Sequence, residues 1–162
     1  MPMQIDLKQL PQGASKLDYE LPPESVGITP QDVTVEGPLK LRLSLDRRGD
    51  EVWIRGRVQL VAVQECSRCL ADFKEPLDLE FEVFCAKVHS PNVVSASVVD
   101  EDDEGVHVHD GRILSIDSEI REAVILGLSM KPLCKETCAG LCPTCGDDRN
   151  LGPCRCARAA AG

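Results

Sequence analysis

Aromatic residues are scarce in this chain, at 3% of its 162 residues, so a hydrophobic core must be built from Val, Ile and Leu. The sequence also lacks a recognisable targeting segment, because the opening MPMQIDLKQL has neither a basic start nor an apolar run. No apolar stretch has the length needed to cross a bilayer. These absences predict a cytoplasmic protein, in which thiols stay reduced.

Positive charge is also in short supply. The chain has 18 Lys and Arg against 27 Asp and Glu, which gives a net charge of −9 and a sequence pI of about 4.8. This balance argues against broad, non-specific nucleic-acid binding, which needs clustered cations. A basic protein is the better match for such a chain. Part of the acidity is local, since residues 100–104 read DEDDE, a run typical of a solvated loop.

A catalytic constellation is missing as well. No serine, histidine and carboxylate set can be recognised, so we predict that the protein is not an enzyme. His107 and His109 lie beside the acidic run, where solvated loop histidines are more common than metal ligands. His89 is isolated in the sequence.

Cysteine, by contrast, is abundant, and eight of the nine cysteines follow a metal-ligand pattern. A CxxC pair directs two thiolates at one metal ion, and zinc needs four such ligands in a tetrahedron with bonds of about 2.3 Å. The sequence therefore predicts one or two zinc ions. Cys85 is left over and is expected to be a small core residue. The eight candidate ligands are Cys66, Cys69, Cys134, Cys138, Cys142, Cys145, Cys154 and Cys156.

Two ways of dividing the eight thiols remain open at this stage. The favoured division puts Cys66, Cys69, Cys134 and Cys138 in one site and the last four cysteines in the other. The competing division joins the two CxxC pairs, as in a zinc ribbon, and leaves the remaining four together. Both divisions tie the C-terminal segment to the first CxxC by metal.

Other thiol chemistries fit less well. Disulfides need an oxidising compartment. The CxxxCxxC spacing of 138–145 matches radical enzymes with a four-iron cluster, but those enzymes need a large barrel that this chain is too short to supply. A thioredoxin-like role for Cys66 and Cys69 needs a βαβ setting, and strands are expected on both sides here. A simple iron–sulfur cluster remains an alternative.

Alternation of apolar and polar residues predicts a β-meander over residues 33–87. Apolar side chains recur at most of the alternate positions in 39–45, 52–60 and 73–83, and the first CxxC lies between the last two runs. We expect an α+β fold, an antiparallel meander or partly open barrel with one C-terminal helix and a cysteine-rich, zinc-binding tail. A turn at Arg48-Gly49 would pair Leu45 with Val52, and a loop at 66–69 would pair Ile54 with Phe81.

The flanking segments are less regular. Residues 1–30 are rich in proline and are expected to form an N-terminal arm with a short strand near 5–7. Residues 88–112 are expected to be a flexible acidic connection in the 31–133 unit, with a β segment near 106–108. Ser115 is the expected N-cap of a helix that Pro132 ends. Its apolar stripe comprises Ile116, Ile120, Ala123, Val124, Gly127 and Leu128. Residues 134–156 form the cysteine-rich segment docked on 66–69, and 157–162 a frayed tail.

Basic residues on the polar face of the meander offer one nucleic-acid hypothesis. Arg42, Arg55 and Arg57 could contact RNA, and Trp53 could stack on a base. The alternative is an ordinary charged sheet face, because acidic residues such as Asp78 and Glu80 are expected to be their neighbours.

Two cysteine-bearing segments resemble the YceD family, which is also named for accumulation of large-subunit ribosomal RNA. They are ECSRCLADF at 65–73 and LCKETCAGLCPTCGDDRNLGPCRC at 133–156, and the resemblance extends over about 30–156. All eight candidate ligands match cysteine positions of the longer family members. In one departure, Leu128-Ser129-Met130 stands where a proline is expected after the helix.

The resemblance implies a bacterial-type protein needed for normal large-subunit ribosomal RNA levels. It also implies a link to a small basic ribosomal protein of that subunit, and no enzymatic activity. The leading hypothesis is therefore a non-enzymatic factor in large-subunit biogenesis, with a subunit precursor or that basic protein as partner. A direct RNA-binding zinc module and a thiol or iron–sulfur redox protein are the alternatives.

Overall fold

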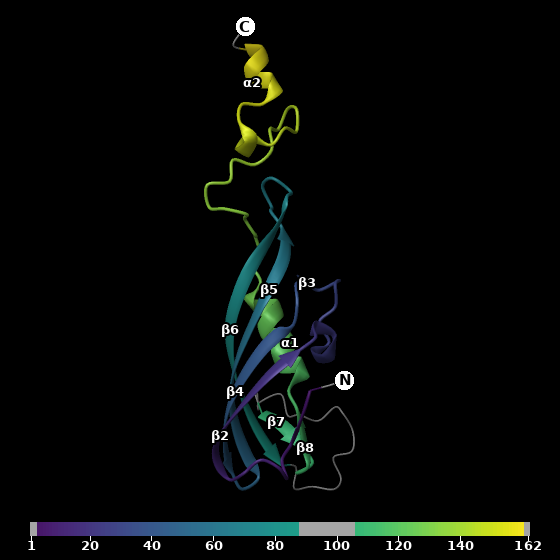
Figure 1. The fold of residues 1–162 in the computed structure, drawn as a ribbon, viewed down its shortest axis with the longest axis vertical. Helices are drawn as coiled ribbons and strands as arrows, with labels where there is room; N and C mark the ends of the chain where they lie inside the picture. The colour runs from purple at the N-terminus through teal and green to yellow at the C-terminus, as the bar shows by residue number, and fades with distance from the viewer. Residues whose placement is uncertain (1–2, 88–105, 161–162) are drawn as a thin grey trace.

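The computed structural model describes residues 3–87 and 106–160, apart from the side chains of 106–108. The fold is α+β, with an open, mainly antiparallel sheet and one main helix (Figure 1). The elements are β1 Gln4–Asp6, β2 Gly13–Leu21, η1 Pro23–Val26, β3 Thr34–Val35, β4 Leu39–Arg48, β5 Glu51–Glu65, β6 Asp72–Lys87, β7 Val106–His109, β8 Ile113–Ser115, α1 Asp117–Gly127, η2 Arg149–Leu151 and α2 Arg155–Ala160.

The main sheet has the strand order β2-β4-β5-β6-β7, with β3 also paired to β5, while β1 and β8 form a separate two-stranded sheet. The predicted meander is confirmed as β4, β5 and β6. Its inner face is lined by Leu39, Leu41, Leu43 and Leu45 of β4, which are at most 2% exposed. Alternate residues of each strand point to opposite faces, so most of the charged residues of these strands lie on the outer face.

Both predicted registers are wrong by two residues. Leu45 pairs with Ile54, and Ile54 pairs in turn with Val83. The tight turn lies at Gly49-Asp50, where Gly49 adopts a φ of 64° that a residue with a side chain rarely takes. The hairpin loop between β5 and β6 spans six residues, 66–71. A shift of two keeps every side chain on its face, so the apolar pattern alone fits both registers.

The N-terminal segment contains more structure than predicted. A short strand is present as β1, but residues 13–21 also form β2, which pairs along its whole length with β4. Gly13 and Ser15 occupy inward-facing positions of this strand, which weakens its apolar alternation. Strand β2 is therefore an edge strand of the main sheet and not part of a loose arm.

Helix α1 packs on the inner face of the sheet, with Ile120 and Val124 buried as predicted. The predicted N-cap is wrong, because Ser115 ends β8 and its hydroxyl donates to Asp117 in the first turn. The predicted end is also wrong: the helix stops at Gly127, and residues 128–133 are non-helical. A Cβ on Gly127 would lie 2.5 Å from the Leu79 side chain, so close approach of helix and sheet favours glycine there.

The remaining predictions concern the segment near 106–108, the histidines and the C-terminal tail. The β segment near 106–108 is confirmed as β7, which pairs in parallel with β6. His109 is 5% exposed and not solvated; Gly111 N–H donates to its Nδ1, so its Nε2–H donates to the Asp50 carbonyl. The tail was predicted to be frayed, yet residues 155–160 form α2. His89 and the acidic run at 100–104 lie outside the described residues.

Candidate metal centres

The first CxxC lies at the tip of the long β5–β6 hairpin, which extends beyond the other strands toward the C-terminal segment (Figure 1). The six-residue tip is closed by two main-chain hydrogen bonds, Cys66 N–H to the Ala71 carbonyl and Leu70 N–H to the Cys66 carbonyl. Leu70 has a φ of 58°. This left-handed residue turns the chain back after Cys69, which leaves both sulfurs on one side of the tip.

The segment after α1 delivers two more cysteines to this tip. Ser67 fastens the segment by donating both its N–H and its hydroxyl to the Pro132 carbonyl, each at 2.9 Å. The Sγ atoms of Cys66 and Cys138 are then 3.8 Å apart, and those of Cys69 and Cys134 are 3.7 Å apart. Four cysteines thus form one cluster, which we call centre one: Cys66, Cys69, Cys134 and Cys138. Other side chains pack around this cluster.

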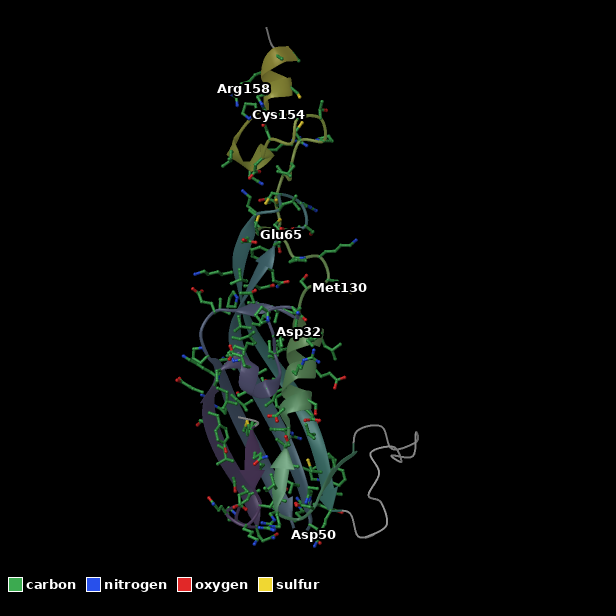
Figure 2. The ribbon with its side chains drawn as sticks, turned by 90° about the vertical axis from the view of Figure 1, so that its right-hand side faces the viewer. Asp32, Asp50, Glu65, Met130, Cys154 and Arg158 are labelled. Carbon is green, nitrogen blue, oxygen red and sulfur yellow. The ribbon has the colours of Figure 1, made fainter. Side chains whose placement is uncertain are left out.

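The last four cysteines form a second cluster, centre two, further along the chain. Cys142 and Cys145 form a knuckle in which Gly146, with a φ of 74°, donates its N–H to the Cys142 carbonyl. Cys154 and Cys156 are held against this knuckle through Arg155, whose main chain and guanidinium both donate to Asp147. Figure 2 places Cys154 beyond the hairpin tip, above Glu65 at the base of that tip.

Both clusters have dimensions that fit a tetrahedral metal. In each, all four sulfurs lie within 4.8 Å of one another. Metal–sulfur bonds of about 2.3 Å give tetrahedron edges of about 3.8 Å, which agrees with the two sulfur–sulfur distances in centre one. These eight residues could therefore hold two metal ions, grouped as in the favoured division and not as in the zinc-ribbon division.

The electrostatics of the clusters also suit a cation. Backbone N–H groups, that of Cys134 foremost, lower the pKa of Cys66 to about 6, and those of Cys145 and Thr144 do the same for Cys142. Each cluster thus contains at least one thiol that ionises readily, and in centre one the hydrogen bond from Asn150 also lowers the pKa of Cys138. Burial raises the pKa of Cys134 to about 12, and Cys145 raises that of Cys156 to about 11. Four thiolates repel one another without a cation, and a divalent ion compensates that repulsion.

Asn150 connects the two centres. It lies in the loop between Cys145 and Cys154 of centre two, yet its Nδ2 donates to the sulfur of Cys138 in centre one at 3.4 Å. Its Oδ1 accepts the N–H of Ala139 at 2.9 Å. The sequence analysis did not identify this residue, although it falls within the C-terminal segment used for the family resemblance.

The hairpin tip also binds the C-terminal segment directly. The Arg68 guanidinium donates to the Cys138 carbonyl at 3.0 Å, and the Arg68 carbonyl accepts the N–H of Leu141 at 3.1 Å. A Cβ on Gly140 would lie 3.0 Å from that Arg68 carbonyl, and Gly140 has a φ of 69°. Arg68 and Gly140 were also missed from the sequence, because their roles depend on contacts between distant segments.

The four residues predicted to contact RNA share the outer face of the sheet. Each arginine is ion-paired: Arg42 with Asp18 at 3.1 Å, Arg55 with Glu82 at 2.8 Å and Arg57 with Asp78 at 2.6 Å. The Trp53 ring, 52% exposed, lies 4.5 Å from that of Phe84. These ion pairs occupy the guanidinium groups that would contact phosphate.

Cys85 belongs to neither centre. It is fully buried on the inner face of β6, and burial raises the pKa of its thiol to about 12. The thiol therefore stays protonated at neutral pH, as expected of a core residue. Among the described residues, no helix has the length and apolar character required of a membrane span.

An uncharacterized protein of Mycobacterium leprae is 31% identical over 116 residues, which cover 72% of this chain and 51% of the relative. Uncharacterized proteins of Mycobacterium bovis and Mycobacterium tuberculosis are 27% identical over 150 residues, covering 90% of this chain and 70% of each relative. The chain thus spans about half the length of the first of these relatives. No solved structure matches it significantly.

The family model described as "Large ribosomal RNA subunit accumulation protein YceD" matches residues 54–161. The match begins in β5 and runs through both cysteine clusters. The chain therefore belongs to the YceD family.

Proposed function

We propose that this protein is a non-enzymatic factor of large ribosomal subunit biogenesis, stabilised by two structural zinc ions. This proposal rests on one observation: in a YceD-family chain, eight cysteines form two clusters of four, and the first cluster joins the C-terminal segment to the end of the sheet. Four-cysteine zinc sites are of the structural type, because catalytic zinc keeps one position open for water or substrate. This supports a role in binding and not in catalysis.

The proposed partner is a large-subunit precursor or a small basic ribosomal protein in the cytoplasm. The net charge of −9 favours a basic protein surface over naked RNA. Such a factor would support ribosomal RNA accumulation by protecting an assembly intermediate or by delivering a basic component to it.

Affinity capture of the full-length protein, followed by sedimentation of the bound material, tests this proposal. We expect large-subunit precursors, a basic ribosomal protein, or both. Absence of both from the captured material would overturn the proposal. Elemental analysis of protein prepared under reducing conditions should give two zinc ions per chain. An absorption band near roughly 400 nm would point instead to an iron–sulfur cluster.

A second candidate function is direct RNA binding by the outer face, where Trp53 lies beside Arg55 on β5. Reversal of charge at Arg42 and Arg55 should then weaken binding to large-subunit RNA fragments and reduce its salt dependence. If RNA binding is unchanged by the charge reversal, this second candidate function is ruled out.

A further inference from the structure

The main sheet has an open edge along β6. Strand β7 pairs only with Phe84–Lys87, and among the described residues no other strand pairs with 72–83 on that side. Pro76 lies within this stretch, and proline is tolerated in a sheet where its missing N–H faces away from a neighbour. An exposed edge of this kind can accept a further strand.

The direction of the main-chain groups along β6 follows from its neighbour β5. The Val61 carbonyl accepts the Glu36 N–H, so it points away from β6. Val61 and its partner Pro76 therefore form a non-hydrogen-bonded pair. The β5–β6 register is uninterrupted. Every second residue of β6 therefore directs its main-chain N–H and carbonyl away from β5, toward the open edge of the sheet. After Pro76, the residues whose main-chain groups face the open edge are Asp78, Glu80 and Glu82.

A groove of about 460 Å³ runs beside this edge, between β6 and α1. Leu79 and Phe81 line it from the strand, and Ala123 and Leu126 line it from the helix. Leu126 is 77% exposed, so its side chain is accessible to a ligand in the groove. The groove therefore offers an apolar floor next to main-chain groups of β6 that pair with no strand in the part of the chain that the structure describes.

The rim of the groove is acidic. Glu80 and Glu82 lie on the strand side, and Glu119 and Glu122 line it from the helix. The Glu80 carboxylate is 3.6 Å from Arg57, whose closer partner is Asp78 at 2.6 Å, and the Glu82 carboxylate is 2.8 Å from Arg55. Among the groove-lining residues there is no Lys or Arg. A cationic ligand is thus favoured, in keeping with the net charge of the chain.

We propose that this edge groove binds an extended basic segment of a partner protein, which adds to β6 as a further strand of about five residues. Its cationic side chains would face the carboxylates, and an apolar side chain would enter the groove beside Leu126. The inference rests on the proposed function, for which it supplies the docking site. A second copy of the chain is disfavoured, since pairing β6 with itself brings Glu80 and Glu82 near their own copies. The same carboxylates repel a nucleic-acid backbone.

A blocked heptapeptide of alternating Lys and Val serves as the probe, added to the full-length zinc-loaded protein. We expect main-chain amide NMR shifts to change at residues 78–82 and along 119–127, and the affinity to fall as salt rises. A peptide methylated at alternate main-chain nitrogens should bind at least tenfold more weakly, because it cannot form the ladder. Equal binding of the methylated peptide, or shifts elsewhere only, would overturn the proposal.

Surface variants provide the matched comparison. Glu122→Lys and Leu126→Lys should each weaken heptapeptide binding at least tenfold. Glu20→Lys on β2 and Leu151→Lys near centre two change equally exposed residues and should leave it unaltered. Unchanged binding in the first pair, or equal loss in both pairs, would contradict the proposal.

Affinity capture from cell extract separates this inference from the proposed function. Loss of the ribosomal partner in Leu126→Lys but not in Leu151→Lys supports both. If both variants retain the partner, the groove proposal fails and the assembly role stands. If the unaltered protein captures no ribosomal partner yet binds the heptapeptide at β6, the groove stands and the assembly role fails.

Discussion

Leu70 is the only non-glycine residue with a positive φ among the described residues of the chain. Its side chain is 56% exposed and therefore contributes little burial, while the left-handed conformation costs an L-residue roughly 1–2 kcal/mol. We predict that Leu70→Gly raises the free energy of unfolding of the zinc-loaded protein by about 1 kcal/mol. Denaturant melts measure the change. Leu70→Ala is the control, because it removes the side chain but keeps the strain; equal stability of the two variants would refute the prediction.

Asn150 tests whether the two centres depend on each other. Removing a group that hydrogen-bonds a metal ligand typically reduces metal affinity 10–100-fold. We predict that Asn150→Ala increases zinc release from centre one to a competing chelator by roughly tenfold, since the Cys138 sulfur loses its donor. The neighbouring exposed Arg149 provides the control variant, Arg149→Ala, which should release zinc as the unaltered protein does. Similar release from both variants would mean that the Asn150 contact has no role in metal retention.

At the scale of the elements, Gly56 governs how β5 and β6 pack against each other. It pairs across the strands with Phe81, and a Cβ at Gly56 would lie 2.1 Å from the tip of that ring. We predict that Gly56→Ala destabilises the protein by about 1–2 kcal/mol, although alanine is ordinarily preferred over glycine in a strand. In a Phe81→Ala background the same substitution should be neutral or stabilising. A thermal-unfolding double-mutant cycle measures the coupling energy between positions 56 and 81. Additive effects of the two substitutions would show that the Phe81 ring moves aside without an energetic cost.

The elements differ in how far the sequence could predict them. Strands β4, β5 and β6 were predictable because one face is buried and apolar residues occupy most of its alternate positions. Their registers were not, because the turn depends on Gly49-Asp50 and a shift of two leaves the apolar pattern intact. Strand β2 escaped prediction because Gly13 and Ser15 interrupt its apolar face. The need for glycine at position 127, where α1 ends, comes from its close approach to Leu79, which no local rule reveals.

For the candidate site, spacing and position along the chain favoured the observed grouping of the cysteines. A hairpin tip supplies only two thiols, so two more had to come from the segment after the helix. The contacts of Arg68 and Asn150 could not be predicted, because each joins segments far apart in sequence. These contacts determine how the two centres are placed beside each other.

At the scale of the whole molecule, the buried apolar side chains of the described residues form two separate clusters at different positions along the long axis. The larger lies between the sheet, α1 and the N-terminal strands, and includes Leu43, Ile54 and Ile120. The smaller surrounds Cys66, Cys69 and Cys138 and includes Phe73 and Leu133. Figure 2 shows Asp50, at the β4–β5 turn, near the opposite end of the molecule from Cys154. The metal centres thus lie outside the main core.

This separation predicts the result of metal removal under reducing conditions. Without a metal ion, no bonds to a shared cation hold the clustered sulfurs together. Residues 134–156 and the hairpin tip should therefore open locally. The amides of β4 and of the β5 segment near Ile54 should keep their protection, because their packing involves no cysteine of either centre. Hydrogen exchange of zinc-loaded and zinc-free protein measures both regions.

The four-residue variant Cys142→Ser, Cys145→Ser, Cys154→Ser and Cys156→Ser should open centre two alone. If protection of the β4 and β5 amides is lost together with that of residues 134–156, the metal centres support the whole fold and the two clusters unfold as one unit.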